Sequence, residues 1–411
     1  MLVGLAAYAV LAGADFGAGF WQLVSGRDER GRDQRELAHH AIGPVWEANH
    51  VWLIFVLVVC WTAYPVAFGS ITSTLAVPLF IAGIGIVLRG TAYALRSGTA
   101  TPHEQRTVEV AFAGSSILTP FALGTVIGGI ASGRVPVGNA AGNLVTSWLN
   151  PTSIVLGVLA VATAAYLAAV YLAADAVRVG RRDLERDFRT RALGTAVVAG
   201  GTALVGLVVV RFDARPIWDG LTSGAGLVAV IVSALGGIAT VFFVLRARYE
   251  PARVTAAVAV AAIVAGWGLA QRPQFLPGLT IQQAAAGRST LVSLIVSLAI
   301  GAVVLVPSLA FLFTLVLRGR FDDARGTTAA EPVPHEARTS ARLLPAAGIC
   351  LVCGTVATML VDSRWGRIVG IPLLLAFVVL AFLAIVPALS KAALCVESTQ
   401  SPAERGDEQA G

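Results

Sequence analysis

The chain has very little charge for its length. Only 13% of its 411 residues are charged, whereas 56% are hydrophobic, and its mean hydropathy is +0.77. A soluble domain carries about a quarter charged residues, so this composition excludes a water-facing globule. The apolar residues form blocks of roughly 20, which match the ~30 Å hydrocarbon core of a bilayer. Backbone groups in lipid must pair within their own element, and the alternating strands of a barrel are missing, which predicts an all-α polytopic membrane protein.

Haem and metal ligands are also scarce: the chain has four Cys, five His and two Met. The cysteines form no disulfide framework, and Cys350 and Cys353, although spaced like a redox or metal pair, fit better as small apolar residues of a helix. Only His50 lies within a predicted span, whereas electron transfer through a buried haem usually needs two axial ligands. There is no P-loop, zinc-ligand spacing or nucleophile elbow. The chain alone is therefore predicted to be catalytically bare.

The apolar blocks predict about eleven transmembrane helices, followed by a short polar tail. The residues from 318 to 342 break the composition, because they are charged and contain proline. We therefore expect a nine-span membrane domain (1–317), a cytoplasmic linker (318–342), an additional two-helix membrane segment (343–389) and a disordered cytoplasmic tail (390–411). The predicted spans are 1–25, 46–68, 75–97, 108–131, 153–176, 192–211, 224–245, 253–271, 290–317, 343–361 and 367–389.

Basic residues alternate strongly between the loops. Loops after odd-numbered spans, together with the tail, hold 22 of the 30 Lys and Arg, and loops after even-numbered spans hold 7. Positively charged loops stay cytoplasmic, so the N-terminus is predicted to lie outside and the C-terminus in the cytoplasm. The same distribution explains the basic pI of about 9.5 without nucleic acid as a partner.

The first three predicted spans contain the charged residues Asp15, Glu47 and Arg89. Such residues cost at least ~2.5–3.5 kcal/mol to insert, so each marks a functional site by default. Counted along the helices, they lie roughly 15, 5 and 12 Å from the cytoplasmic face, which would allow one hydrated cluster. Gly13, Gly17 and Gly19 leave room for another helix beside Asp15, and Tyr93 shares a helical face with Arg89.

Two interpretations of this cluster remain open. Asp15 and Arg89 would form a buried ion pair that fixes helix packing, or the carboxylates would relay protons from the cytoplasm while Arg89 tunes them or holds a polar ligand. Trp46 is either an aromatic anchor at the interface or part of that pocket. Trp52, which lies deeper, would pack against a ring-bearing cofactor or against neighbouring helices.

The same segments resemble a known family. Gly13-Ala14-Asp15-Phe16-Gly17-Ala18-Gly19, and then Pro44-Val45-Trp46-Glu47-Ala48-Asn49-His50-Val51-Trp52-Leu53, are similar to the motifs of subunit II of cytochrome bd-type quinol oxidases. The spacing from Glu47 to Arg89 and the Tyr64-Pro65 element also fit. The resemblance is strong over residues 5–130, weaker over 260–310 and only topological between them.

The resemblance implies a bacterial cytoplasmic-membrane protein that pairs with a haem-bearing subunit I, which oxidises quinol and reduces dioxygen to water. Haems b and d would reside on that partner, and subunit II would support it and contribute to proton delivery. Asp15 and Glu47 are carried over to the proton path, and Trp46, Asn49, Trp52 and Arg89 to a polar pocket or quinone site. Some family members hold a structural quinone in this subunit.

The chain departs from the family at His50, where Gln is common, and in its two additional spans. The pair at 343–389 would replace a small accessory subunit or cover an exposed face. A proton-coupled secondary transporter is the alternative function, with Asp15 and Glu47 as coupling carboxylates. Transporters often have two related halves, and no second copy of either segment is found. A purely structural scaffold is a third alternative.

Overall fold

The computed structural model describes residues 1–26, 28–42, 46–95, 102–317 and 337–359 and short pieces between 369 and 380. Side chains are described over a smaller set, which leaves out 40–48, 93–107 and 309–344 among others. The chain divides into two compact units, Met1–Arg318 and Gly319–Gly411. Of the predicted linker at 318–342, residues 318–336 lie outside the described residues, whereas 337–342 are helical and not a linker. The tail at 390–411 and most of the span at 367–389 also lie outside the described residues.

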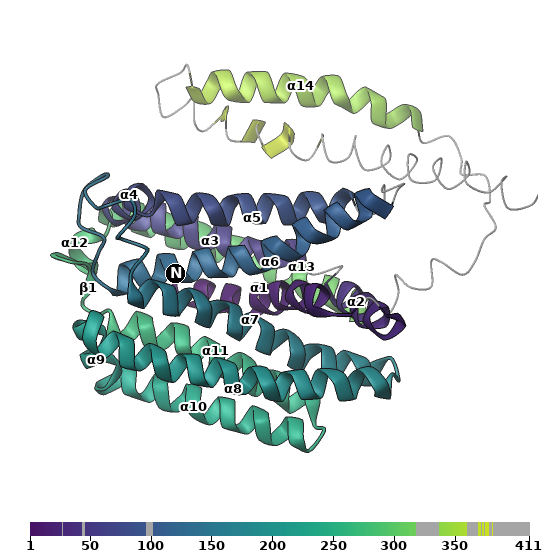
Figure 1. Cartoon of the computed structure of the whole chain (residues 1–411). Helices are drawn as coiled ribbons and strands as arrows, with labels where there is room; N and C mark the ends of the chain where they lie inside the picture. The colour runs from purple at the N-terminus through teal and green to yellow at the C-terminus, as the bar shows by residue number, and fades with distance from the viewer. Residues whose placement is uncertain are drawn as a thin grey trace, which may run out of the picture. The chain divides into compact units, whose positions relative to one another are not determined.

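The first unit is a bundle of long helices with a small hairpin (Figure 1). Strands β1 and β2 pair antiparallel, with Gln274 opposite Thr280. In chain order its elements are α1 (Leu2–Val24), α2 (Glu29–Ile42), α3 (Trp46–Ala63), α4 (Pro65–Thr74), α5 (Ala76–Leu95), α6 (Pro102–Ala131), α7 (Pro151–Arg178), α8 (Arg182–Asp213), α9 (Arg215–Leu221), α10 (Gly224–Leu245), α11 (Tyr249–Ala270), β1 (Gln274–Leu276), β2 (Leu279–Thr280), α12 (Ile281–Ala284) and α13 (Arg288–Leu317). In the second unit the structure describes α14 (Ala337–Met359).

Multiple helices are long and apolar enough to cross a membrane. Among the described residues seven meet that test, and the bent pair α4–α5 would make an eighth. The seven lie on α1, α6, α7, α8, α10, α11 and α13, each at a predicted span. The apolar part of α14 is shorter, Pro345–Gly354. A multi-pass helical membrane protein is therefore confirmed, whereas the count of eleven and the placement of the termini stay predictions.

The second predicted span, 46–68, was wrong in its extent. Helix α3 ends at Ala63, and Pro65 opens α4, which meets α5 at a bend of 84°. Proline has no N–H and disfavours helical geometry in the preceding residue, so Tyr64 leaves the helix at φ −138°. The apolar sequence continues across this break, and hydropathy alone therefore concealed it.

Helix α7 forms the centre of the bundle and packs against α1, α6, α8 and α11. Its buried side is rich in alanine, and small residues let membrane helices approach closely. The closest approach is to α1 at Gly17, where an added Cβ would lie 1.9 Å from the Ala164 carbonyl oxygen. Trp21 fixes the same pair of helices, because its indole N–H donates to the Ala165 carbonyl oxygen at 2.9 Å.

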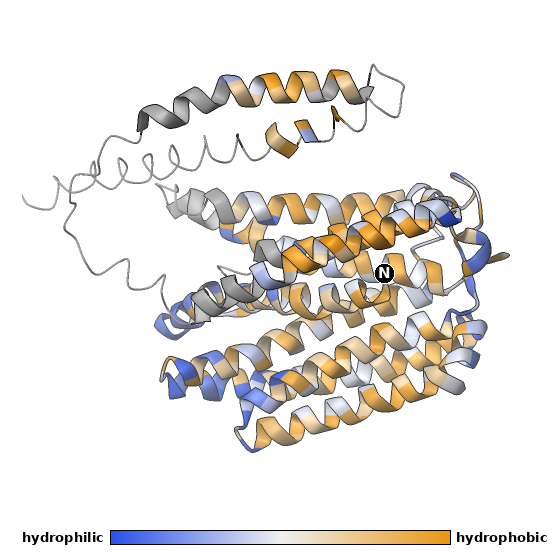
Figure 2. Cartoon of the chain, turned by 180° about the vertical axis from the view of Figure 1, so that it is seen from behind, coloured by the Kyte–Doolittle hydropathy of each residue, from blue (hydrophilic) through white to orange (hydrophobic). Residues whose placement is uncertain are grey.

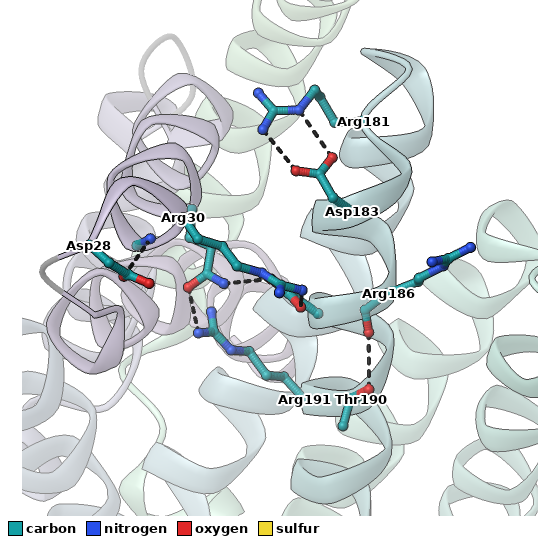
Figure 3. Close-up of polar contacts among 10 residues, drawn as sticks. Asp28, Arg30, Arg181, Asp183, Arg186, Thr190 and Arg191 are labelled. Atoms are coloured by element: carbon teal, nitrogen blue, oxygen red, sulfur yellow. Dashed lines mark hydrogen bonds and ion pairs between the residues drawn. The ribbon is translucent and has the colours of Figure 1, made fainter.

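Charged side chains gather at the end of the bundle formed by α2 and the α7–α8 and α10–α11 turns, here called the charged end. Asp187 accepts hydrogen bonds from Arg30 Nε at 2.8 Å and from Gln34 at 2.7 Å, and Arg191 donates to Gln34 (Figure 3). Arg178 pairs with Glu250 across the two turns at 2.8 Å. Three basic loops predicted to share one side of the membrane therefore lie together.

The opposite end, formed by α9, α12 and the β1–β2 hairpin, is called the hairpin end. There Arg134 forms a two-bonded ion pair with Asp213, at 2.9 and 2.6 Å. Asp213 also accepts a hydrogen bond from the Thr152 hydroxyl at 2.6 Å. The hydrogen bond with Asp213 raises the pKa of Arg134 above its ordinary value, so this arginine stays charged at any physiological pH.

Apolar side chains remain exposed along the helices between the two ends. Figure 2 shows hydrophobic residues along the helices and hydrophilic residues concentrated at the ends. On α8 and α13, Val197, Leu204, Val303 and Val304 are each more than 60% exposed. Surfaces of this kind would be unstable in water, whereas lipid accommodates them.

Candidate functional site

Helices α1, α5 and α6 enclose a buried ion pair. Asp15 on α1 accepts a hydrogen bond at its Oδ1 from Arg89 Nη2 on α5, at 2.7 Å, and the same nitrogen donates to the Asp15 carbonyl oxygen at 2.9 Å. Their side chains are only 3% and 1% exposed. The ion pair considered from the sequence is present, and it agrees with the similar depths predicted for the two residues.

Arg89 is held on its other sides by α6 and α1. Its Nη1 donates to the Ser116 hydroxyl, which in turn donates to the Phe112 carbonyl oxygen at 2.7 Å. The guanidinium carbon lies 4.3 Å from the centre of the Phe112 ring and 5.0 Å from that of Phe16. A planar cation between two aromatic rings gains cation–π stabilisation that partly offsets its loss of water. Arg89 is therefore fixed in one position.

Glycines create the space for this arrangement. An added Cβ at Gly19 would lie 2.1 Å from Ser116 Oγ and 2.9 Å from Arg89 Nη1. At Gly85, one turn from Arg89, a Cβ would lie 2.2 Å from Thr119 Oγ1. A larger side chain at either position would force Ser116 or Thr119 on α6 to move, so both glycines serve the packing of the pair.

The other predicted site residues are placed less completely. Asn49 is buried on α3, and its side-chain amide donates to the Leu11 carbonyl oxygen at 3.3 Å. Trp52 packs beside the cluster of Tyr8, Ala12 and Phe16. Three more are placed by backbone alone, and their side chains lie outside those described: Trp46 and Glu47 in the first turn of α3 and Tyr93 near the end of α5.

The structure adds partners that the sequence did not reveal. Ser116 and Phe112 hold Arg89 from α6, and nothing in their local sequence distinguishes them from neighbouring apolar and small residues. His50 on α3 has its ring 6.1 Å from that of Tyr8 and 6.0 Å from that of Phe16, with edges facing rings. His50 therefore lies beside the cluster of Tyr8 and Phe16.

Several polar atoms around the pair are buried with no hydrogen-bond partner among the described residues: Asp15 Oδ2, Arg89 Nε, Tyr8 Oη and Thr119 Oγ1. Buried polar groups rarely remain unpaired in proteins, and water usually satisfies them. Across the described part of the chain, no three His, Cys, Asp or Glu side chains are grouped so as to hold a metal ion. What this site offers is a carboxylate with one oxygen held and one available.

Comparison with known proteins agrees with this architecture. Residues 1–316 match the family model described as cytochrome bd terminal oxidase subunit II. A Bacillus subtilis (strain 168) protein, provisionally named cytochrome bd menaquinol oxidase subunit II, is 23% identical over 76% of this chain and 92% of its own length. The cytochrome bd ubiquinol oxidase subunit 2 of the same organism is 28% identical over 28% of this chain and 33% of its own length.

Among solved structures, the bd oxidase from Geobacillus thermodenitrificans contains a similar chain. It aligns with a TM-score of 0.61 and 26% identity, covering 77% of this chain and 96% of that one. The family match ends at residue 316, close to the boundary between the two compact units. The segment from 319 onward is thus an addition to the matched region. The chain belongs to the cytochrome bd terminal oxidase subunit II family.

Proposed function

We propose that this chain pairs with a haem-bearing subunit I in a bd-type quinol oxidase of the bacterial cytoplasmic membrane and delivers protons to it. Haems b and d would be held by that partner, which oxidises quinol and reduces dioxygen to water. Family membership supports the assembly. The observation that carries the proton role is the buried Asp15–Arg89 pair, with one carboxylate oxygen left available.

Energetics favour a role beyond packing. Removing two charges from water costs several kcal/mol each, and hydrophobic residues of similar volume often stabilise a buried site as well as or better than an ion pair. A charged pair that is almost completely buried among α1, α5 and α6 is therefore expected to serve a function. A structural quinone remains an additional proposal, with Trp46, Asn49, Trp52, Arg89 and Tyr93 as its pocket.

The geometry suits proton transfer through Asp15. Arg89 Nη2 holds Oδ1 and the backbone carbonyl, so the carboxylate cannot rotate freely. A proton can bind to and leave Oδ2 without breaking either contact. Glu47, in the first turn of α3, would exchange protons with Asp15 through water. In this arrangement Arg89 orients the carboxylate and is not itself a proton carrier.

The test is turnover of the purified oxidase complex with the variants Asp15→Asn and Glu47→Gln. Both changes keep shape and remove the titrating group, and general acid–base groups contribute about 10²–10⁴-fold, so we expect a large loss of turnover and of proton uptake. Asp213→Asn at the hairpin end is the matched control and should retain turnover. Normal turnover of both test variants in a correctly assembled complex would favour a purely structural scaffold.

A further inference from the structure

Two buried hydroxyl groups, those of Thr119 and Tyr8, lie on the side of Asp15 that faces the hairpin end. Thr119 is three residues beyond Ser116 on α6, about 4.5 Å along the axis, and Tyr8 is seven residues from Asp15 on α1, about 10.5 Å. Both side chains are at least nine-tenths buried, with exposures of 0% for Thr119 and 6% for Tyr8. Neither hydroxyl has a hydrogen-bond partner among the described residues.

Two further contacts show where Thr119 lies relative to the ion pair and to Tyr8. The Thr119 hydroxyl lies against Gly85, one turn from Arg89 on α5. Leu123, one turn further along α6 than Thr119, packs on the cluster that contains Tyr8, Ala12 and Phe16. Thr119 therefore lies between the level of the ion pair and the level of Tyr8.

We propose that Tyr8 and Thr119 line a narrow water-filled chamber that continues the proton path from Asp15 toward the hairpin end. The role of the chamber in proton transfer rests on the proposed proton role of Asp15. The presence of the chamber does not depend on that role. The ligand class is water, because the unpaired groups are an acceptor oxygen, an N–H donor and two hydroxyls. A hydroxyl can accept one hydrogen bond while donating another, and water molecules between them complete the connection.

The surroundings of the chamber include other groups that titrate or carry charge. His50 faces it from α3 through its ring contacts with Tyr8 and Phe16, and Arg89 and Asp15 close it at the inner end. In this proposal the hydroxyls of Tyr8 and Thr119 hold and orient the water molecules. Apolar side chains from α3 and α6, among them Trp52, Leu53 and Leu123, pack against the cluster that contains Tyr8.

The experiment uses the complete oxidase complex, with cryo-EM maps resolved well enough to show ordered water, and the variants Tyr8→Phe and Thr119→Val. Each variant removes one hydroxyl and keeps the shape of the side chain. We expect water density beside both hydroxyls in the unmodified complex, loss of the adjacent water in each variant, and about a fivefold fall in turnover, the factor that one lost hydrogen bond corresponds to. Tyr166→Phe, a tyrosine 5% exposed on α7 in a different cluster, is the control and should leave turnover unchanged.

The outcomes separate the chamber from the proton role. A map in which side chains fill the space between Tyr8, Thr119 and Asp15 without water would overturn the chamber. Ordered water with unchanged turnover in both variants would overturn their part in the path. Ordered water together with normal turnover in Asp15→Asn would refute the proton role of Asp15 and leave the chamber standing.

Discussion

The energetic claim about the buried pair can be tested with a double-mutant cycle on Arg89 and Asp15. Arg89→Met keeps an unbranched apolar stem, removes the cation and leaves the Asp15 carboxylate buried without its counter-ion. The exposures of 1% and 3% mean that water cannot compensate without rearrangement. Breaking a buried pair on one side costs about 3–5 kcal/mol.

Adding Asp15→Asn to Arg89→Met removes the uncompensated charge. We expect the double variant to recover about 2 kcal/mol or more relative to Arg89→Met alone, because the larger part of the single-variant cost is an unpaired charge and not lost packing. Arg215→Met is the control: its ion pair with Asp219 spans 3.4 Å, and the two side chains are 67% and 64% exposed. Such surface pairs contribute about 0–1 kcal/mol.

The assay is the thermal midpoint of the detergent-solubilised complex. For a domain of this size, each kcal/mol corresponds to roughly 2 °C, so Arg89→Met should lower the midpoint by about 6–10 °C and the double variant by clearly less. If the double variant were as unstable as Arg89→Met, the cost would come from lost packing around the guanidinium, and the argument from charge would be refuted.

Three further predictions concern the bundle itself. Gly17→Ala should lower the thermal midpoint, because its Cβ would lie 1.9 Å from a backbone oxygen of α7 and overpacking costs about 1–3 kcal/mol. Gly200→Ala on α8 is the control and should not lower it, because nothing lies within 4 Å of that Cβ. Equal midpoints for the two variants would contradict the close approach of α1 and α7. Asp213→Ala should lower the stability of the complex by about 1–3 kcal/mol, measured by thermal melting, because Arg134 and Thr152 lose their shared hydrogen-bond acceptor. An unchanged midpoint would show that these hydrogen bonds do not stabilise the hairpin end. In intact cells, an impermeant thiol reagent should label a cysteine introduced in the turn at 139–141 and should not label one introduced at 179–181, and the reverse pattern would invert the orientation.

The sequence predicted the helical architecture well because apolar blocks of membrane length are a strong local signal. The sequence was less informative where the structure depends on tertiary packing or where continuous hydropathy hides a local break. Helix α2, Glu29–Ile42, lies between two predicted spans, where apolar blocks give no signal, although its Glu, Arg, Gln and Ala residues favour helix formation. The break before Pro65 has a plain local cause and was missed because hydropathy continues across it.

The site was predictable in part for the same reason. A carboxylate and a guanidinium in apolar segments are rare enough to indicate a functional pair, and counting residues predicted that Asp15 and Arg89 lie at similar levels, as their ion pair confirms. The identity of Ser116 and Phe112 as partners depends on how α6 is rotated against α5, which no local pattern specifies. Tyr8 and Thr119 were invisible for a further reason: they are significant only because nothing in the described protein satisfies their hydroxyls.

The most direct test of the central claim is purification of the tagged full-length chain from its native membrane, followed by absorbance spectroscopy and a quinol oxidase assay. The account predicts a stable complex with a larger membrane subunit, haem b and d absorbance, and oxygen consumption that depends on added quinol. On separation, the haem absorbance should remain with the partner. A chain that purifies alone as a stable, haem-free protein and transports a solute into proteoliposomes would contradict the account and favour the transporter alternative.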